Sequence, residues 1–321
     1  MRRVLRSPKM LAGLCLCAVF VIIAAIGPLV APYSPNVSAS TTLGIAQPPS
    51  AAHLLGTTQT QQDVLSQLLV GGRSTILVSL VAGVAATALA VGFGVAAGYL
   101  GGWADDLLSM LANIFLVLPA LPLLIVIFGL LGRSNNPNDL LIGVIIAVTG
   151  WAFGARQLRA QTLSMRARDF VDSAKIIGER SWRIMAFEIL PNLVPIVATS
   201  FLFTVIYGVG TFTALSFLGV INTSQWSWGT MLYWAQNAQA AQDVHIQWWW
   251  FVPPGLAVGL FGTGLALLNF GIDEYVNPRL RAAGITGRRA RRAGLPRHVR
   301  LGLTPVLPSR RPVLRSEEAA R

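Results

Sequence analysis

The sequence predicts an all-α protein that crosses a membrane six times, and three observations support this fold class. Of its 321 residues, 54% are hydrophobic and only 12% are charged, whereas an ordinary soluble domain carries about 25% charged residues. Six apolar stretches contain no charged residue, and a helix of about 20 such residues crosses the hydrocarbon core of a bilayer. Lys and Arg gather on one side of these stretches. A water-soluble globule is therefore not expected.

The six predicted spans are residues 11–31, 76–100, 107–131, 140–155, 193–220 and 248–271. Their Leu, Ile, Val and Ala side chains favour insertion, whereas one central Arg would cost about 2.5 to 3.5 kcal/mol. The fourth span is the shortest and ends against Arg156. The length of the first span, together with Pro28 and Pro32, favours a retained helix over a cleaved signal peptide. Residues 11–283 are thus predicted to form one transmembrane domain.

The distribution of basic residues predicts the orientation of the chain. With a cytoplasmic N terminus, the inside segments hold 23 of the 25 Lys and Arg residues, and the outside segments hold only Arg73 and Arg133. Cytoplasmic loops carry such an excess, so residues 1–10 and the basic, disordered tail 284–321 are both predicted to be cytoplasmic in an inner (plasma) membrane. The tail is predicted to be solvated, and contact with anionic membrane lipid is the alternative. No aromatic-interleaved RNA-binding pattern accompanies these charges, so no nucleic acid partner is expected.

The spans lack the residues that most catalytic or ion-coupled mechanisms need. Neither Lys9 nor Lys175 follows a glycine-rich phosphate-binding loop, so this chain is not expected to hydrolyse ATP or to be an enzyme. His53, His245 and His298 lie outside the spans without a second ligand at metal-binding spacing, so neither a catalytic residue nor a metal site is predicted. Ion-coupled carriers usually place ionisable groups within their spans, whereas these spans hold only neutral polar groups.

Residues 156–192 are the longest predicted cytoplasmic segment between two spans, and their pattern indicates a structured element. From Phe170 the apolar residues recur at helical spacing, which predicts a short amphipathic helix. Gly178 is placed to end this helix in a left-handed C-cap. Ser181 is then predicted to cap a second helix that stops before Pro191. Two short helices that meet at a glycine turn suit a groove on a partner protein, and a helix lying at the lipid interface is the alternative.

This segment resembles the EAA-x3-G-x9-I-x-L-P loop of ABC importer permeases. The sequence has Asp172-Ser173-Ala174, then Gly178 after three residues, and Glu188-Ile189-Leu190-Pro191 after nine more. In that family the loop forms a coupling helix that docks into the cytoplasmic ATPase subunit. The resemblance carries this role to Asp172, Ala174, Gly178, Leu190 and Pro191. The departures are Asp172 for Glu, Ser173 for Ala and Glu188 for Ile.

Further strings are similar to the peptide-type permeases of this family, specifically the C component of dipeptide or oligopeptide transport systems. They are HLLGT at 53–57, DVLS at 63–66, GYLGGW at 98–103, LSFLG at 215–219, SWG at 227–229 and NPRL at 277–280. Each string is weak alone, but their order and spacing on a six-span chain are typical of the family. The resemblance implies the type I ABC importer permease fold and half of a translocation pathway for dipeptides or oligopeptides.

The resemblance also implies partners and a transport path. The partners are a homologous B-type permease, an extracytoplasmic peptide-binding protein, and two ATP-binding subunits, or a fused one, that hold ATP and Mg; this chain itself holds no cofactor. Asn113, Thr204, Tyr207 and Asn269 are the candidate path residues. Residues 33–72 and 221–247 are the candidate receptor-facing surfaces. Relatives that carry nickel or glutathione leave the substrate open, and an ion-coupled carrier or channel is the alternative from another class.

Tryptophan is concentrated near the predicted outer ends of the last two spans. The residues are Trp226, Trp228, Trp234, Trp248, Trp249 and Trp250. Trp is enriched at membrane–water interfaces, where its amphipathic ring lies at the level of the headgroups. The cluster is therefore predicted to anchor the helices at the interface rather than to form a ligand cage.

Overall fold

The structure is a computed structural model that describes residues 8–37, 46–131, 137–238 and 244–276. Within these ranges the regular structure is helical, apart from one isolated bridge between Thr57 and Asp63, which confirms the all-α class. Among the described residues, five helices are long and apolar enough to cross a membrane, and the number is six if one bent pair of helices counts as a single span. The predicted tail 284–321, the NPRL string at 277–280 and most of the predicted N-terminal segment 1–10 lie outside the described residues.

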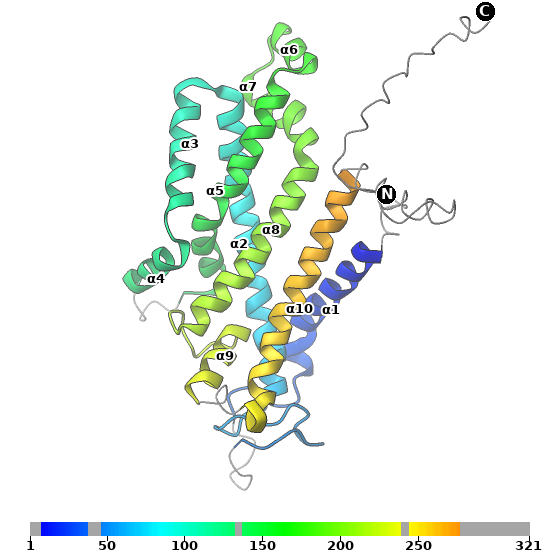
Figure 1. The fold of residues 1–321 in the computed structure, drawn as a ribbon, viewed down its shortest axis with the longest axis vertical. Helices are drawn as coiled ribbons and strands as arrows, with labels where there is room; N and C mark the ends of the chain where they lie inside the picture. Colours follow the sequence, from blue (N-terminus) through cyan, green and yellow to red (C-terminus); the bar gives the residue numbers. More distant parts are fainter. Residues whose placement is uncertain (1–7, 38–45, 132–136, 239–243, 277–321) are drawn as a thin grey trace, which may run out of the picture. The chain divides into compact units, whose positions relative to one another are not determined.

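The helices follow the predicted order, with differences at their ends (Figure 1). They are α1 (Pro8–Val30), α2 (Val64–Leu100), α3 (Gly102–Val117), α4 (Ala120–Leu131), α5 (Asp139–Arg166), α6 (Asp169–Ile176), α7 (Ser181–Arg183), the π-helix η3 (Ile184–Ile189), α8 (Leu190–Phe217), α9 (Trp228–Asn237) and α10 (Val244–Val276). The second helix begins at Val64 instead of residue 76, because Asp63 caps it with a side-chain hydrogen bond to the Ser66 N–H.

The predicted span 107–131 is not one continuous helix, because two helices divide it. α3 and α4 are bent by 90° relative to each other. At the break, Leu118 has an extended backbone with ψ of 129°. Proline has no N–H for the helical ladder and disfavours the helical conformation of the residue before it. Pro119 therefore ends α3 at the point where the hydropathy pattern continues without interruption.

The segment between the fourth and fifth predicted spans is also more helical than expected. α5 continues to Arg166, and the chain from Ser181 to Phe217 is helical throughout. The predicted stop before Pro191 is wrong, because η3 widens the turn and the Leu190 N–H bonds to the Met185 carbonyl five residues earlier. Such π turns change the helical register without ending a helix. Arg180, not Ser181, is the N-cap residue of α7, and it makes no side-chain capping bond.

α2 lies at the centre of the packing, against α1, α3, α5, α8 and α9. Its most extensive packing is against α5, where a Cβ added to Gly94 would lie 2.5 Å from the Ala155 carbonyl oxygen. Within a membrane the hydrophobic effect does not drive helices together, and small residues at such contacts let the helix backbones pack closely instead. Asp105 of α3 and Arg159 of α5 form a two-bond ion pair with distances of 2.5 and 2.7 Å. This pair joins the start of α3 to α5.

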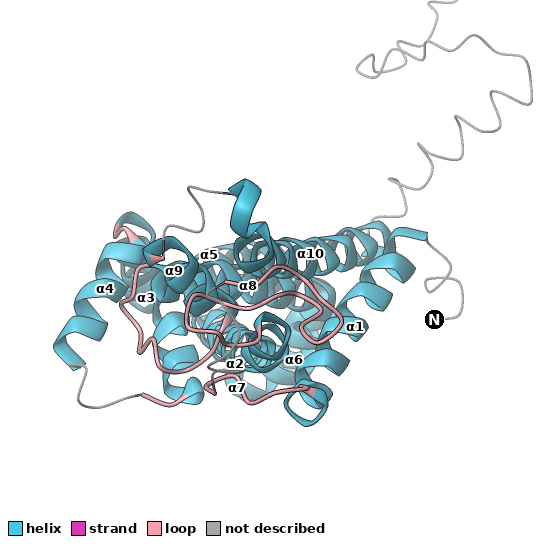
Figure 2. Cartoon of the chain, turned by 90° about the horizontal axis from the view of Figure 1, so that it is seen from below, coloured by secondary structure: helices cyan, strands magenta, loops and turns pink. Residues whose placement is uncertain are grey.

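The helix ends form two distinct groups within residues 8–276. One group, called the α6 end here, includes α6 and the turn at Gly101; the other, called the α9 end, includes α9 and residues 46–63 (Figure 1). Figure 2 looks at the α9 end and shows irregular segments running across the helix ends. The alternation of inside and outside segments predicted from the sequence requires this separation.

The prediction of interfacial anchors is wrong for part of the tryptophan cluster. Trp228, Trp249 and Trp250 are buried in the core that joins α1, α2, α8, α9 and α10. Trp228 packs edge-on against Phe20 and donates its indole N–H to the Leu68 carbonyl at 3.1 Å. Trp234 and Trp248, by contrast, are exposed. A buried Trp usually finds a hydrogen-bond partner, as Trp228 does. At this end of the protein some tryptophans therefore pack in the core and others are exposed on the surface.

Candidate functional site

Residues 169–183, called the knob here, extend beyond the long helices at the α6 end (Figure 1). Val171 and Ala174 are the buried face of α6 and join a core that includes Ile184 and Ile189. Phe170, which the helical spacing places on the same stripe, is exposed. The short helix is therefore fixed to the start of the next long helix by few apolar contacts. A displacement of the knob would act directly on that helix.

Gly178 adopts the left-handed conformation that the sequence predicts, with φ of 87°. The Glu179 N–H bonds to the Ala174 carbonyl at 3.1 Å, and the Gly178 N–H bonds to the Lys175 carbonyl at 3.0 Å. This pair of bonds is the Schellman arrangement that closes a helix C-terminus. A Cβ at Gly178 would meet no atom within 4 Å. The glycine is thus required by its backbone conformation and not by crowding.

The tip of the knob is apolar and open. Ile176 and Ile177 are 86% and 80% exposed. The neighbouring Trp182 and Phe187 are also exposed and lie edge to face, with ring centroids 6.2 Å apart. Large apolar side chains that gather exposed on one short segment favour an interaction site. Charged pairs flank it, namely Asp172 with Lys175 at 2.9 Å and Glu179 with Arg183.

The five predicted coupling residues fall on two parts of this region. Asp172 faces outward in its ion pair, Ala174 is buried, and Gly178 forms the turn. Leu190 and Pro191 lie beyond η3 at the start of α8, where Pro191 is exposed. The structure therefore brings Asp172, Ala174 and Gly178 together in the knob. Leu190 and Pro191 belong to the helix that the knob is attached to.

Two of the predicted path residues share a cavity of about 150 Å³. Its lining comes from α5, α8 and α10: Phe153, Gly154, Gln157, Thr199, Ser200, Phe203, Thr204 and Asn269. Thr204 also bonds to Thr87 of α2 at 3.2 Å, so it ties helices together as well as lining the cavity. The Asn269 Oδ1 atom is buried and has no hydrogen-bond partner. A buried unpaired acceptor is costly, so such a group calls for a specific explanation.

The other two predicted path residues lie apart from this cavity. Tyr207 is on α8, and its hydroxyl is 2.9 Å from the Thr149 hydroxyl of α5. Asn113 is exposed on α3 and lines a separate cavity of about 250 Å³ together with Arg156 and Arg159. Thr204, Tyr207 and Asn269 are therefore grouped around α8, and Asn113 is not part of that group.

Sequence reasoning missed two features of the cavity. Phe153 and Phe203 are both exposed, and their ring centroids lie 5.4 Å apart. Gln157 lies one turn beyond Phe153 in a segment predicted to be a loop. The extension of α5 to Arg166 places Gln157 on the same helical face as Phe153, four residues apart. An unbroken helical pattern across Arg156 would have been the signal for Gln157.

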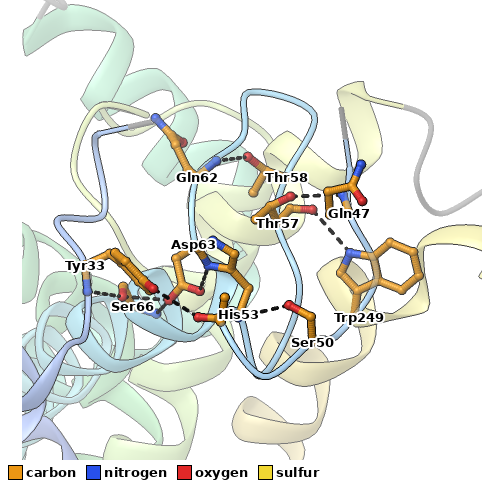
Figure 3. A network of polar contacts seen from close by, with 11 residues as sticks. Tyr33, Gln47, Ser50, His53, Thr57, Thr58, Gln62, Asp63, Ser66 and Trp249 are labelled. Atoms are coloured by element: carbon orange, nitrogen blue, oxygen red, sulfur yellow. Dashed lines mark hydrogen bonds and ion pairs between the residues drawn. The ribbon is translucent and has the colours of Figure 1, made fainter. Parts of the chain in front are cut away.

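A buried polar network closes the α9 end (Figure 3). Asp63 accepts from the His53 Nδ1 at 2.9 Å, and its other oxygen accepts from the Ser66 N–H and hydroxyl at 2.8 and 2.7 Å. The Tyr33 N–H in turn donates to the Ser66 hydroxyl at 3.1 Å. Trp249 of α10 donates to the Thr57 carbonyl at 3.2 Å. The network fastens the segment that follows α1 to the start of α2 and to α10.

Several helices long and apolar enough to cross a membrane, with a knob beyond their ends, define a polytopic membrane protein. The chain belongs to the family of binding-protein-dependent transport system inner membrane components, whose model matches residues 90–282. A model of the N-terminal transmembrane domain of oligopeptide transport permease C matches residues 1–49. These two matches cover both the first span and the region that carries the knob.

Individual relatives match over most of their length. The oligopeptide transport system permease protein OppC of Mycobacterium bovis is 30% identical over 283 residues, which are 88% of this chain and 94% of that protein. The dipeptide transport system permease protein DppC of Bacillus subtilis is 29% identical over 281 residues, 87% of this chain and 85% of that protein. A DppC of Alkalihalophilus pseudofirmus is 29% identical over 278 residues, 85% and 86% of the two chains.

Proposed function

We propose that this chain is one of two permease subunits of an ATP-driven importer of dipeptides or oligopeptides. The names of its relatives support the peptide substrate, and family membership supports transport with a binding protein. The observation that carries the proposal is the knob, whose exposed apolar tip lies on the segment that resembles the EAA loop. The second permease subunit would be a homologous B-type chain. ATP and Mg would be held by partner ATPase subunits.

The knob would couple ATP hydrolysis to movement of the spans. Ile176 and Ile177 would enter an apolar groove on an ATPase subunit, as an amphipathic helix enters the groove of a partner. Because Val171 and Ala174 pack on the residues that begin the Ser181–Phe217 helix, a shift of the ATPase would move that helix with the knob. Alternating access then follows from the reorientation of α8 and its neighbours. This requires the α6 end and both chain termini to be cytoplasmic.

A pair of substitutions at Gly178 tests the coupling role. In Gly178→Val the left-handed backbone is strained, whereas Gly178→Asn tolerates that conformation. The strain is worth about 1 to 2 kcal/mol. We therefore expect ATPase co-purified with the detergent-solubilised chain to fall about 5- to 30-fold in Gly178→Val and to stay near the wild-type amount in Gly178→Asn. ATP-driven peptide uptake in proteoliposomes should fall in parallel.

Two outcomes would contradict the proposal. Equal ATPase recovery with both variants would show that the Gly178 turn is not needed for docking. Peptide uptake by the wild-type chain alone, without ATP or an ATPase subunit, would replace the importer with an independent carrier. Because a Cβ at Gly178 meets no atom of this chain, neither variant is expected to misfold.

The path would run beside α8 and would be lined by Thr204, Tyr207 and Asn269. Asn113 lies on α3 and lines a separate cavity. The strongest support for this path is Asn269, whose Oδ1 atom is buried without a partner. Leu has a similar size and removes this unpaired atom, so Asn269→Leu should leave stability unchanged or higher. We expect it to lower ATP-driven peptide uptake severalfold. Uptake and thermal unfolding of the purified transporter measure the two effects.

A change on the same helix supplies the control for Asn269. Thr263 is exposed on α10, and its hydroxyl donates to the Gly259 carbonyl one turn earlier, at 2.7 Å. Thr263→Val should therefore leave uptake unchanged. If Asn269→Leu also transports at the wild-type rate, the path does not pass Asn269.

A further inference from the structure

Another cavity, larger than the two described above, lies at the α9 end and belongs to neither the knob nor the path. It has a volume of about 570 Å³, within the range of ligand pockets, which is about 300 to 1,000 Å³. Its lining includes three indoles and several amides: Trp226, Trp234, Trp250, Asn36, Gln59 and Asn237. The described residues that line it include no charged side chain. The cavity is thus aromatic and rich in neutral hydrogen-bonding groups.

Hydrogen bonds between distant segments hold the walls of this cavity. The Trp226 indole N–H donates to the Asn36 Oδ1 at 2.5 Å, and the Gln59 Nε2 donates to the Ala238 carbonyl at 2.7 Å. Both bonds join the segment after α1 to the region of α9. The Trp234 indole N–H donates to the Thr223 carbonyl at 3.3 Å. A ligand would therefore meet a preformed site, which reduces the entropy lost on binding.

One polar group of the lining is left without a partner inside the protein. Trp250 is only 4% exposed, and its indole N–H has no hydrogen-bond acceptor among the described residues. A buried donor without an acceptor costs about 1 to 3 kcal/mol. The other two indoles of the lining donate within the protein. Trp250 is therefore the donor that a bound molecule would satisfy, with a carbonyl oxygen or another neutral acceptor.

We propose that this cavity is a binding site for the main chain of a short peptide, which holds the transported substrate at the outer end before it enters the path. This inference rests on the proposed function. Peptide groups supply both donors and acceptors, which amide side chains and an indole N–H match. Flat peptide and side-chain surfaces pack on the indole rings. Because the described lining residues carry no charge, the site is expected to bind independently of the charged ends of the peptide.

The depth of the site favours the free peptide over a surface of the binding protein. The unpaired N–H belongs to a residue that is almost fully buried, and an extended chain reaches such a position more readily than a folded surface does. Contacts that steer two proteins together are usually charged, whereas this lining is neutral. A loop of the binding protein is the other source of the same chemistry, and the test distinguishes it.

The test measures peptide binding to the purified transporter without the binding protein. The probe is N-acetyl-Ala-Phe-Ala-amide, which has no charged end, and a version with benzoylphenylalanine at the middle position serves for photocrosslinking. Trp250→Phe keeps an aromatic ring, a smaller one than the indole, and removes the N–H, so we expect Kd to rise about 3- to 10-fold. Trp248→Phe is the matched control, because Trp248 is the exposed neighbour in α10 and does not line the cavity. Its Kd should stay within about twofold of wild type.

Crosslinks of the wild-type transporter should map to residues 223–238, and Trp250→Phe should weaken them. The inference is overturned if wild type does not bind the probe, if Trp250→Phe binds it as tightly as wild type, or if the crosslinks lie only in α5 and α8. Crosslinking that appears only after a binding protein carrying the label in a loop is added would assign the cavity to that loop, and would also overturn it. ATP-driven uptake is measured on the same preparation. Normal uptake without probe binding rejects this inference alone, whereas loss of ATP dependence rejects the proposed function.

Discussion

The double substitution Ile176→Asp and Ile177→Asp is expected to abolish ATP-driven uptake and to remove the ATPase from the purified chain. Both side chains are more than three-quarters exposed in this protein. An apolar side chain of this size gains about 1.5 to 3 kcal/mol when it is fully buried. Replacing both by carboxylates removes that gain and places two charges in an apolar groove, so ATPase recovery should fall more than about 100-fold. Co-purification followed by an ATPase assay measures it.

Because Ile176 and Ile177 are exposed, the double substitution should weaken binding to the ATPase without weakening the packing of this chain. Its unfolding temperature should match that of wild type. Leu54→Asp supplies the control, since Leu54 is an exposed apolar residue at the opposite, α9 end. That variant should retain the ATPase. An ATPase that co-purifies normally with the double variant would place the docking surface elsewhere on the chain.

The sequence predicts those features that depend on local chemistry. A charge-free apolar run allows only a buried or membrane helix, so the order of the spans could be predicted without knowledge of packing. The left-handed conformation of Gly178 could be predicted because helices commonly end at a glycine in that conformation. α2 and α5 extend beyond their predicted bounds because a helix can continue through polar residues outside the apolar run. The apolar run alone therefore does not show where the helix begins or ends.

Other features depend on contacts that no local pattern reveals. Pro119 separates two helices at 90°, whereas Pro191 follows a π turn within a continuous helix. Both prolines remove one backbone donor, and the surrounding packing decides whether the chain bends or changes its register. Trp228 is buried and Trp234 is exposed on the same short helix for a similar reason. The α9-end cavity arises from segments that are almost 200 residues apart in sequence, so the sequence alone did not indicate it.

The substitution Asp63→Ala is expected to cause the largest loss of stability among single changes at the α9 end. Asp63 is 1% exposed, caps α2 and accepts three hydrogen bonds. Alanine removes the cap, worth about 1 kcal/mol, and leaves the buried His53 and Ser66 side-chain donors unpaired, which together cost about 1 to 3 kcal/mol more. We expect a total loss of about 2 to 4 kcal/mol and a decrease in Tm of roughly 5 to 10 °C for the purified transporter.

Two further variants separate the network from the cap itself. Asp63→Asn keeps an oxygen for the Ser66 N–H but replaces the carboxylate that His53 contacts, so about half of the decrease in Tm should remain. Asp139→Ala removes a carboxylate from the first turn of α5, where Asn138 is the cap. It should cost only about 0.3 to 1 kcal/mol, through the helix dipole. If Asp63→Ala lowers Tm no more than Asp139→Ala, the network does not hold the segment after α1 in place, and the α9-end cavity has no fixed wall on that side.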